Sequence, residues 1–140
     1  MNGRRMVLAS LAAFFSYFVL GGLLFTLPGM KAEFSRFPAV YRSAADLKSV
    51  FPLGMAAMLV AMVVLVALYA RGCQSWGRFE GARFGALLGI FSVCAFVVHN
   101  YVNLNIDRRL TLAQAAAYFL EWLVVGVVIG AVYKPLPAVR

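Results

Sequence analysis

The sequence contains little charge and few of the side chains that carry enzyme chemistry. Only 13% of its 140 residues are charged, five residues are acidic and one is a histidine. Soluble domains average about a quarter charged residues. The two cysteines form no Cys-x-x-Cys motif, so the usual signals of a redox pair or attached haem are missing. No nucleophile paired with a base is recognisable, and we therefore expect no enzymatic activity and no cofactor.

Metal ligands are equally scarce. His99 offers a single imidazole, which is too little for a haem or metal site. Three methionines recur at positions i, i+3 and i+7: Met55, Met58 and Met62. Such a stripe suits a soft metal such as Cu(I), but it more often provides flexible packing. Cys73 falls in a loop and Cys94 in a hydrophobic run, about 15 Å or more apart along a helix. We predict neither a metal site nor a disulfide.

Long hydrophobic runs are what the sequence does contain. It is 64% hydrophobic, with a mean hydropathy of +0.87. A helix needs roughly 20 apolar residues to cross a bilayer core, and four runs reach that length: 6–27, 50–70, 84–106 and 113–133. None alternates apolar and polar residues as a barrel strand would. We predict an all-α polytopic membrane protein: one four-transmembrane-helix bundle, residues 1–140, with an interfacial loop at 28–49.

The net charge of +8 is spread around the ends of these runs. This placement favours anionic lipid headgroups and excludes a nucleic-acid partner, because no basic module is left over to read bases. The first run is longer than the hydrophobic part of a signal peptide, so we expect it to remain as an anchor. Arg4 and Arg5 favour cytoplasmic termini. We expect an integral protein of a bacterial cytoplasmic membrane, with both termini on the cytoplasmic side.

The longest loop carries aromatic residues at helical spacing. Phe34, Phe37 and Tyr41 recur at i, i+3 and i+7, and Pro38 interrupts any single helix through them. The pattern is typical of a connector that lies at the level of the headgroups. The sharper alternative is a lid or a lipid-binding element.

The fourth run contains an acidic residue, Glu121, near its middle. An acidic group at the bilayer centre costs about 2.5–3.5 kcal/mol even on insertion scales. It must face the bundle, find a partner or stay protonated. At 100° per residue, Gln114, Tyr118 and Glu121 share one polar arc of the helix. An intramembrane carboxyl is by default a hypothesis for a functional site, although it also serves as a hydrogen-bonded contact between helices.

The third run ends in a polar cluster that contains His99. Asn103 falls close to His99 around the helix, and Asn100 falls further away. Counted from a turn near Arg109, His99 and Glu121 both lie about 15–18 Å down their helices. We expect the two side chains to meet, with Glu121 facing the third helix. The candidate ligand- or proton-binding residues are Glu121, His99, Asn103, Asn100, Tyr118 and Gln114.

Glycines at every fourth position mark a second kind of face. Small residues at this spacing allow two helix backbones to approach closely. The helix-packing candidates are Gly81, Gly85 and Gly89 in the third run and Gly126 and Gly130 in the fourth. The last two lie about 140–180° from Glu121. We expect them to face a partner helix or a second protomer.

The turn between the last two runs carries helix-end signals. Arg108 and Arg109 suit the negative end of the third helix. Thr111 and Gln114 then form a capping box that would begin the fourth helix at Thr111.

Two hypotheses about function follow. The first is a small membrane protein that binds or transports a small solute or ion, with proton coupling through Glu121 and His99. The second is a non-catalytic structural or accessory subunit of a larger membrane complex, in which the polar cluster fixes helix register. Either would assemble as a homo-oligomer or with a partner membrane subunit.

Overall fold

The computed structural model describes residues 2–72 and 76–134, within which all regular structure is helical. Cys73, predicted in a loop, lies outside these residues. The helices are, in chain order, α1 (Gly3–Thr26), α2 (Pro28–Ser35), α3 (Ala44–Gly72), α4 (Arg78–Ser92), η1 (Val93–Val98), α5 (His99–Asn103) and α6 (Arg108–Val132).

Within the described residues, four helices are long and apolar enough to cross a membrane: α1, α3, the continuous helix Arg78–Asn103 and α6. The prediction of an all-α membrane protein built as a four-helix bundle is confirmed. The helices extend beyond most of the predicted run boundaries. The segment 28–49 is not a plain loop, because it holds α2 and the first turns of α3.

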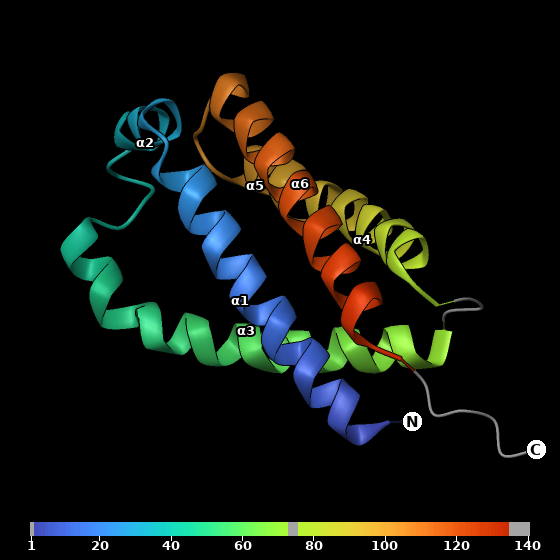
Figure 1. The fold of residues 1–140 in the computed structure, drawn as a ribbon. Coiled ribbons are helices and arrows are strands. Elements are labelled where there is room, and N and C mark those ends of the chain that lie inside the picture. Colours follow the sequence, from blue (N-terminus) through green and yellow to red (C-terminus); the bar gives the residue numbers. More distant parts are fainter. Residues whose placement is uncertain (1, 73–75, 135–140) are drawn as a thin grey trace, which may run out of the picture.

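The bundle is compact on one side and open on the other (Figure 1). α6 lies between α4 and α1, and both pack along it. α3 packs mainly against α1 and crosses it at an angle, so that its first half diverges from the bundle. The N-terminus and the end of α6 lie at the same end of the molecule.

Glycines bring α4 and α6 into close backbone contact. A methyl group added to Gly85 would lie 2.6 Å from the backbone oxygen of Trp122, and one added to Gly126 would collide with the backbone of Gly81. Gly130 likewise packs against Gly81. The expectation that Gly126 and Gly130 face an outside partner is therefore wrong. They meet the glycine face of the third span inside the chain, because two small-residue faces allow the closest helix approach.

The hydrophobic core joins α1, α3 and α6 at the end of the molecule that holds the N-terminus. Its members are Ala9, Ala13, Phe14, Met62, Val66, Tyr69, Val125, Ile129 and Tyr133. The α3 residues among them all come from its second half. The first half of α3 therefore has few buried side chains, and it is free to form one wall of a cavity.

The residue that caps the N-terminus of α6 differs from the one predicted. The N-cap is Asp107, whose carboxylate accepts a hydrogen bond of 2.9 Å from the Leu110 N–H. The helix therefore begins at Arg108 rather than at Thr111. The Thr111 hydroxyl donates to the Asp107 carbonyl oxygen at 2.8 Å, and Gln114 reaches away from the cap. Asp107 prevails because an anionic side chain at a helix N-terminus also meets the positive end of the dipole.

Ion pairs tie α2 to this helix start. Arg36 contacts Asp107 at 2.7 Å and Glu33 at 2.5 Å, and Arg109 contacts Glu33 at 2.8 Å. The Glu33 side chain is mostly buried, whereas both arginines are substantially exposed. The network holds α2 over the start of α6 and fixes the beginning of the loop that leads to α3.

Replacing Gly85 by alanine should lower the thermal unfolding temperature of the protein in detergent, because the methyl group would overlap the α6 backbone. Overpacking of this kind typically costs about 1–3 kcal/mol. Gly22→Ala is the matched control, since a methyl group there has nothing within 4 Å. Helix propensity alone should leave that variant equally or more stable. Equal unfolding temperatures for the two variants would contradict the close α4–α6 contact.

Asp107→Asn should lower the unfolding temperature at neutral pH and lose this effect in acid. The hydrogen bond from Leu110, together with the charge of Arg36, holds the pKa of Asp107 below its ordinary value of 3.8, although desolvation opposes the shift. A carboxyl whose pKa is lowered by folding stabilises the fold at pH values above its pKa in the unfolded state. That contribution disappears as the pH falls through its pKa in the folded state. Unfolding measured across acidic pH should show the two proteins converging below pH 3.8. A difference that stays constant down to strong acid would argue against this role.

Candidate functional site

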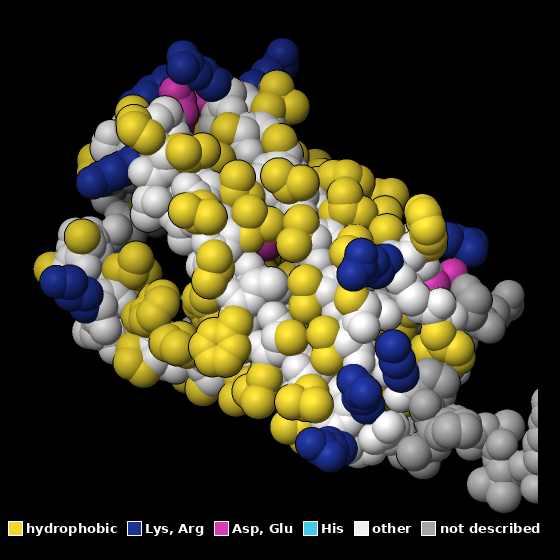
Figure 2. All heavy atoms as spheres, in the orientation of Figure 1, with side chains coloured by type: hydrophobic (Ala, Val, Ile, Leu, Met, Phe, Trp, Pro, Cys, Tyr) yellow, Lys and Arg dark blue, Asp and Glu magenta, His cyan; other side chains and the backbone are white. Residues whose placement is uncertain are grey.

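A cavity of about 1230 Å³ lies between α3, from its start to Leu65, and the rest of the bundle. Its lining comes from α1, α3, the third span, α6 and the connection between α2 and α3. Figure 2 shows the molecule hollowed between α1 and the start of α3, with hydrophobic side chains along the edge. The cavity exceeds the roughly 300–1,000 Å³ of ordinary small-molecule pockets.

The walls are mainly apolar and aromatic. The Phe25 ring packs on that of Tyr118 at 5.2 Å, and the Tyr17 ring packs on that of Trp122 at 5.4 Å, so two aromatic pairs join α1 to α6 beside the cavity. On α3 the wall is built from Leu47, Met58, Ala61, Val64 and Leu65. Met58 thus serves as a wall residue, whereas Met62 is fully buried in the core.

The third span contributes a segment of π-helix to this wall. η1 (Val93–Val98) replaces the α-helical pattern for six residues, and Phe96 and Val97 from it line the cavity. π-Helical turns are rare and frequently occur at functional sites, because the wider turn re-aims the side chains that follow. The residues of η1 are apolar like most of the span before them, so the sequence carried no signal for a π-helix.

Three of the six predicted ligand residues line the cavity: Asn100, Gln114 and Tyr118. The Gln114 amide donates a hydrogen bond of 3.2 Å to the Tyr41 hydroxyl, which links α6 to the loop before α3. These side chains add a few polar groups to an apolar cavity, an arrangement common in ligand sites.

Glu121 is buried but faces a different neighbour from the one predicted. Its side chain is 1% exposed and its carboxylate packs on Gly21 of α1, where an added methyl group would collide with it. Neither carboxylate oxygen has a hydrogen-bond partner among the described residues. The expectation that Glu121 faces the third helix is wrong, because the glycine face of α6 takes that contact and turns Glu121 toward α1.

His99 and Asn103 are not part of this site. Both side chains are exposed, neither lines the cavity, and the Asn103 amide donates to the His99 carbonyl oxygen at 2.9 Å. The predicted meeting of His99 and Glu121 is not found, since one is at the surface and the other is enclosed by α1. The asparagine instead satisfies a backbone carbonyl at the helix end, where such groups lack helical partners.

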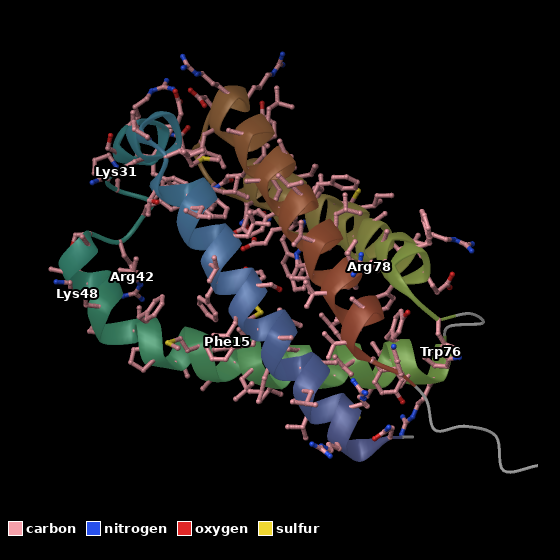
Figure 3. All side chains as sticks on the ribbon, viewed as in Figure 1. Phe15, Lys31, Arg42, Lys48, Trp76 and Arg78 are labelled. Carbon is pink, nitrogen blue, oxygen red and sulfur yellow. The ribbon has the colours of Figure 1, made fainter. Side chains whose placement is uncertain are left out.

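The cavity residues that sequence reasoning missed include Lys31, Arg42 and Trp122. Figure 3 shows Arg42 on the side of the α3 start that faces α1, whereas Lys48 points outward. The Trp122 indole N–H is buried without a hydrogen-bond partner among the described residues. The one available signal was the basic and aromatic loop that the sequence suggested as a lid or lipid-binding element.

No metal centre accompanies the cavity in the part of the chain that the structure describes, where no three His, Cys, Asp or Glu side chains come together. Comparison with protein-family models, with curated proteins and with solved structures found no match. The function of this membrane protein is therefore argued from the geometry of the cavity and of Glu121.

Proposed function

We propose that this protein binds a small amphipathic molecule from the membrane in the cavity beside α3. The observation that carries the proposal is the cavity itself, with a volume of about 1230 Å³ and walls that are mainly apolar. A soluble solute would need more polar contacts than these walls offer. Moving a molecule with a long apolar part from the bilayer into the cavity lowers its free energy only if the cavity walls fit its shape closely. The aromatic pairs supply surfaces for such a fit.

The position of α3 supports entry from the side. Its second half is anchored in the core through Met62, Val66 and Tyr69. Its first half lies beyond that anchor and diverges from the bundle, and the cavity is lined both by this half and by Ala61, Val64 and Leu65 next to the anchor. A ligand could therefore reach the cavity past the first half of α3 without disturbing the core.

Glu121 would couple this binding to a proton. The carboxyl lies directly behind the cavity wall, between Tyr118 and Trp122 in the sequence, and packs on Gly21. The titratable groups that interact with it electrostatically are Tyr17 and Tyr118, both of which line the cavity. A change in the charge of Glu121 would alter the packing of α1 on α6 beside the ligand.

Binding can be followed through Trp122. In a Trp76→Phe background Trp122 is the remaining tryptophan, and brominated amphiphiles quench its fluorescence on contact. In phosphatidylcholine nanodiscs, dibromostearyl alcohol should quench Trp122 saturably. Ala61→Phe should weaken this binding about tenfold or more, because the added ring would occupy part of the space that the probe needs.

Val60→Phe is the matched control, because Val60 neighbours Ala61 but is 64% exposed and does not line the cavity. It should leave the quenching curve unchanged. Quenching that rises linearly with the probe, alike in all three proteins, would reflect partition into the bilayer alone and would overturn the proposal.

Glu121→Gln tests the proton coupling. The alcohol probe does not titrate, so any pH dependence of its affinity must come from the protein. We expect its affinity to change with pH in the Trp76→Phe background and to be independent of pH when Glu121→Gln is added. Glutamine keeps the size of the side chain, and thermal unfolding checks that the fold is retained. A pH dependence that survives the substitution would remove Glu121 from the coupling.

The second hypothesis, an accessory subunit, is favoured by a different observation. The most hydrophobic window of α3 has only 11% of its residues buried inside the structure. Lipid or a partner membrane subunit would cover that surface. Purification in mild detergent that yields a partner in fixed ratio, with no saturable binding at Trp122, would favour the accessory role over ligand binding.

A further inference from the structure

The mouth of the cavity carries charge of one sign. Among the described residues that line it, the charged ones are Lys31, from α2, and Arg42, just before α3. The other described lining side chains are apolar or uncharged. The two cations therefore come from different elements, and Figure 3 shows α2 with Lys31 and the start of α3 with Arg42 on the same side of the molecule.

Neither cation is neutralised by a neighbouring acid. Within the described residues the acidic side chains near this end already have partners. Glu33 pairs with Arg36 and Arg109, and Asp107 pairs with Arg36. Asp46, one turn after Arg42, accepts a hydrogen bond of 2.6 Å from Ser43. Lys31 and Arg42 make no ion pair in this part of the chain, and both are exposed.

A neutral donor, the Tyr41 hydroxyl, belongs to a residue that lines the same cavity. The Tyr41 hydroxyl accepts its hydrogen bond from Gln114, so its own proton is left to donate. Its ring is held edge-on to that of Phe34 at 4.7 Å. A ligand oxygen at the mouth would thus meet two cations and an oriented O–H donor, a set that favours an anion with several acceptor oxygens.

We propose that the ligand is an anionic single-chain amphiphile: a long apolar chain that ends in a carboxylate or a phosphate monoester. The chain would lie between α3 and the aromatic pairs of α1 and α6, and the acidic group would lie at Arg42 and Lys31. This inference rests on the proposed function and names its substrate class. The expected position of the cations in the membrane agrees with their charge. The interfacial helix α2 and the mouth of the cavity lie at the same end of the bundle, where lipid headgroups would be.

The experiment compares two probes that differ only in the head group. With the Trp76→Phe protein in phosphatidylcholine nanodiscs at moderate salt, dibromostearate should bind Trp122's cavity more tightly than dibromostearyl alcohol. Each probe concentration is corrected for its own partition into empty nanodiscs. Arg42→Gln should weaken the acid about fivefold, the size expected of one charge pair at a partly exposed site. It should leave the affinity for the alcohol within a factor of about two.

Two further variants make the result specific. Lys31→Gln should act like Arg42→Gln, and the double variant should bind acid and alcohol alike. Lys48→Gln is the matched control, because it removes an exposed cation on α3 that does not line the cavity. Competition by unlabelled stearate and by stearyl phosphate then tells which acidic group fits better.

The outcomes separate the two proposals. Saturable quenching of equal strength by acid and alcohol, unchanged in Arg42→Gln and Lys31→Gln, would overturn the anionic ligand while leaving a cavity that binds amphiphiles. An equal loss of acid binding in Lys48→Gln would assign the effect to general surface charge and would overturn the inference as well. No saturable quenching by either probe would overturn the proposed function itself.

Discussion

The close contact of α4 with α6 is the interaction on which the rest of the structure depends. Gly81 and Gly85 meet Gly126 and Gly130 backbone to backbone, and their spacing leaves no room for a side chain between the helices. This contact fixes the rotation of α6 about its own axis. The opposite face of α6 is thereby turned to α1, and Glu121 is carried with it into the contact with Gly21. The burial of this carboxyl, which has no hydrogen-bond partner among the described residues, is thus a consequence of how the glycines pack.

The same contact leaves α3 as the outlying helix. Because α6 is occupied by α4 on one side and by α1 on the other, α3 is held mainly through α1 and through one end of the core. Its first half diverges from the other helices, and the space left between them is the cavity. The ion pairs of Arg36 and Glu33 hold α2 at the mouth of that space, where Lys31 and Arg42 add positive charge. Close packing on one side and an open wall on the other are compatible with the proposed binding of a ligand.

The sequence predicted the class of fold because hydrophobic length decides whether a helix can cross a bilayer. It also identified the glycines, whose spacing marks a packing face, but it could not tell which face they meet. Helical periodicity gives the angle of a residue around its own helix, but it does not tell which neighbouring helix that residue contacts. The predicted contact of Glu121 with His99 therefore rests only on their similar depth in the membrane. In the structure, the Glu121 carboxylate packs instead on Gly21 of α1. The π-helix of η1 and the cations at the cavity mouth depend on how the helices come together, which no local pattern records.

The most direct test of the account is a crystal structure of the protein grown with dibromostearate, in which anomalous diffraction locates the bromine atoms. The account predicts bromine density inside the cavity, between the first half of α3 and the Trp122 side chain, with the carboxylate at Arg42. Bromine found only along the lipid-facing surface of α3, with the cavity closed by a shift of that helix, would contradict it.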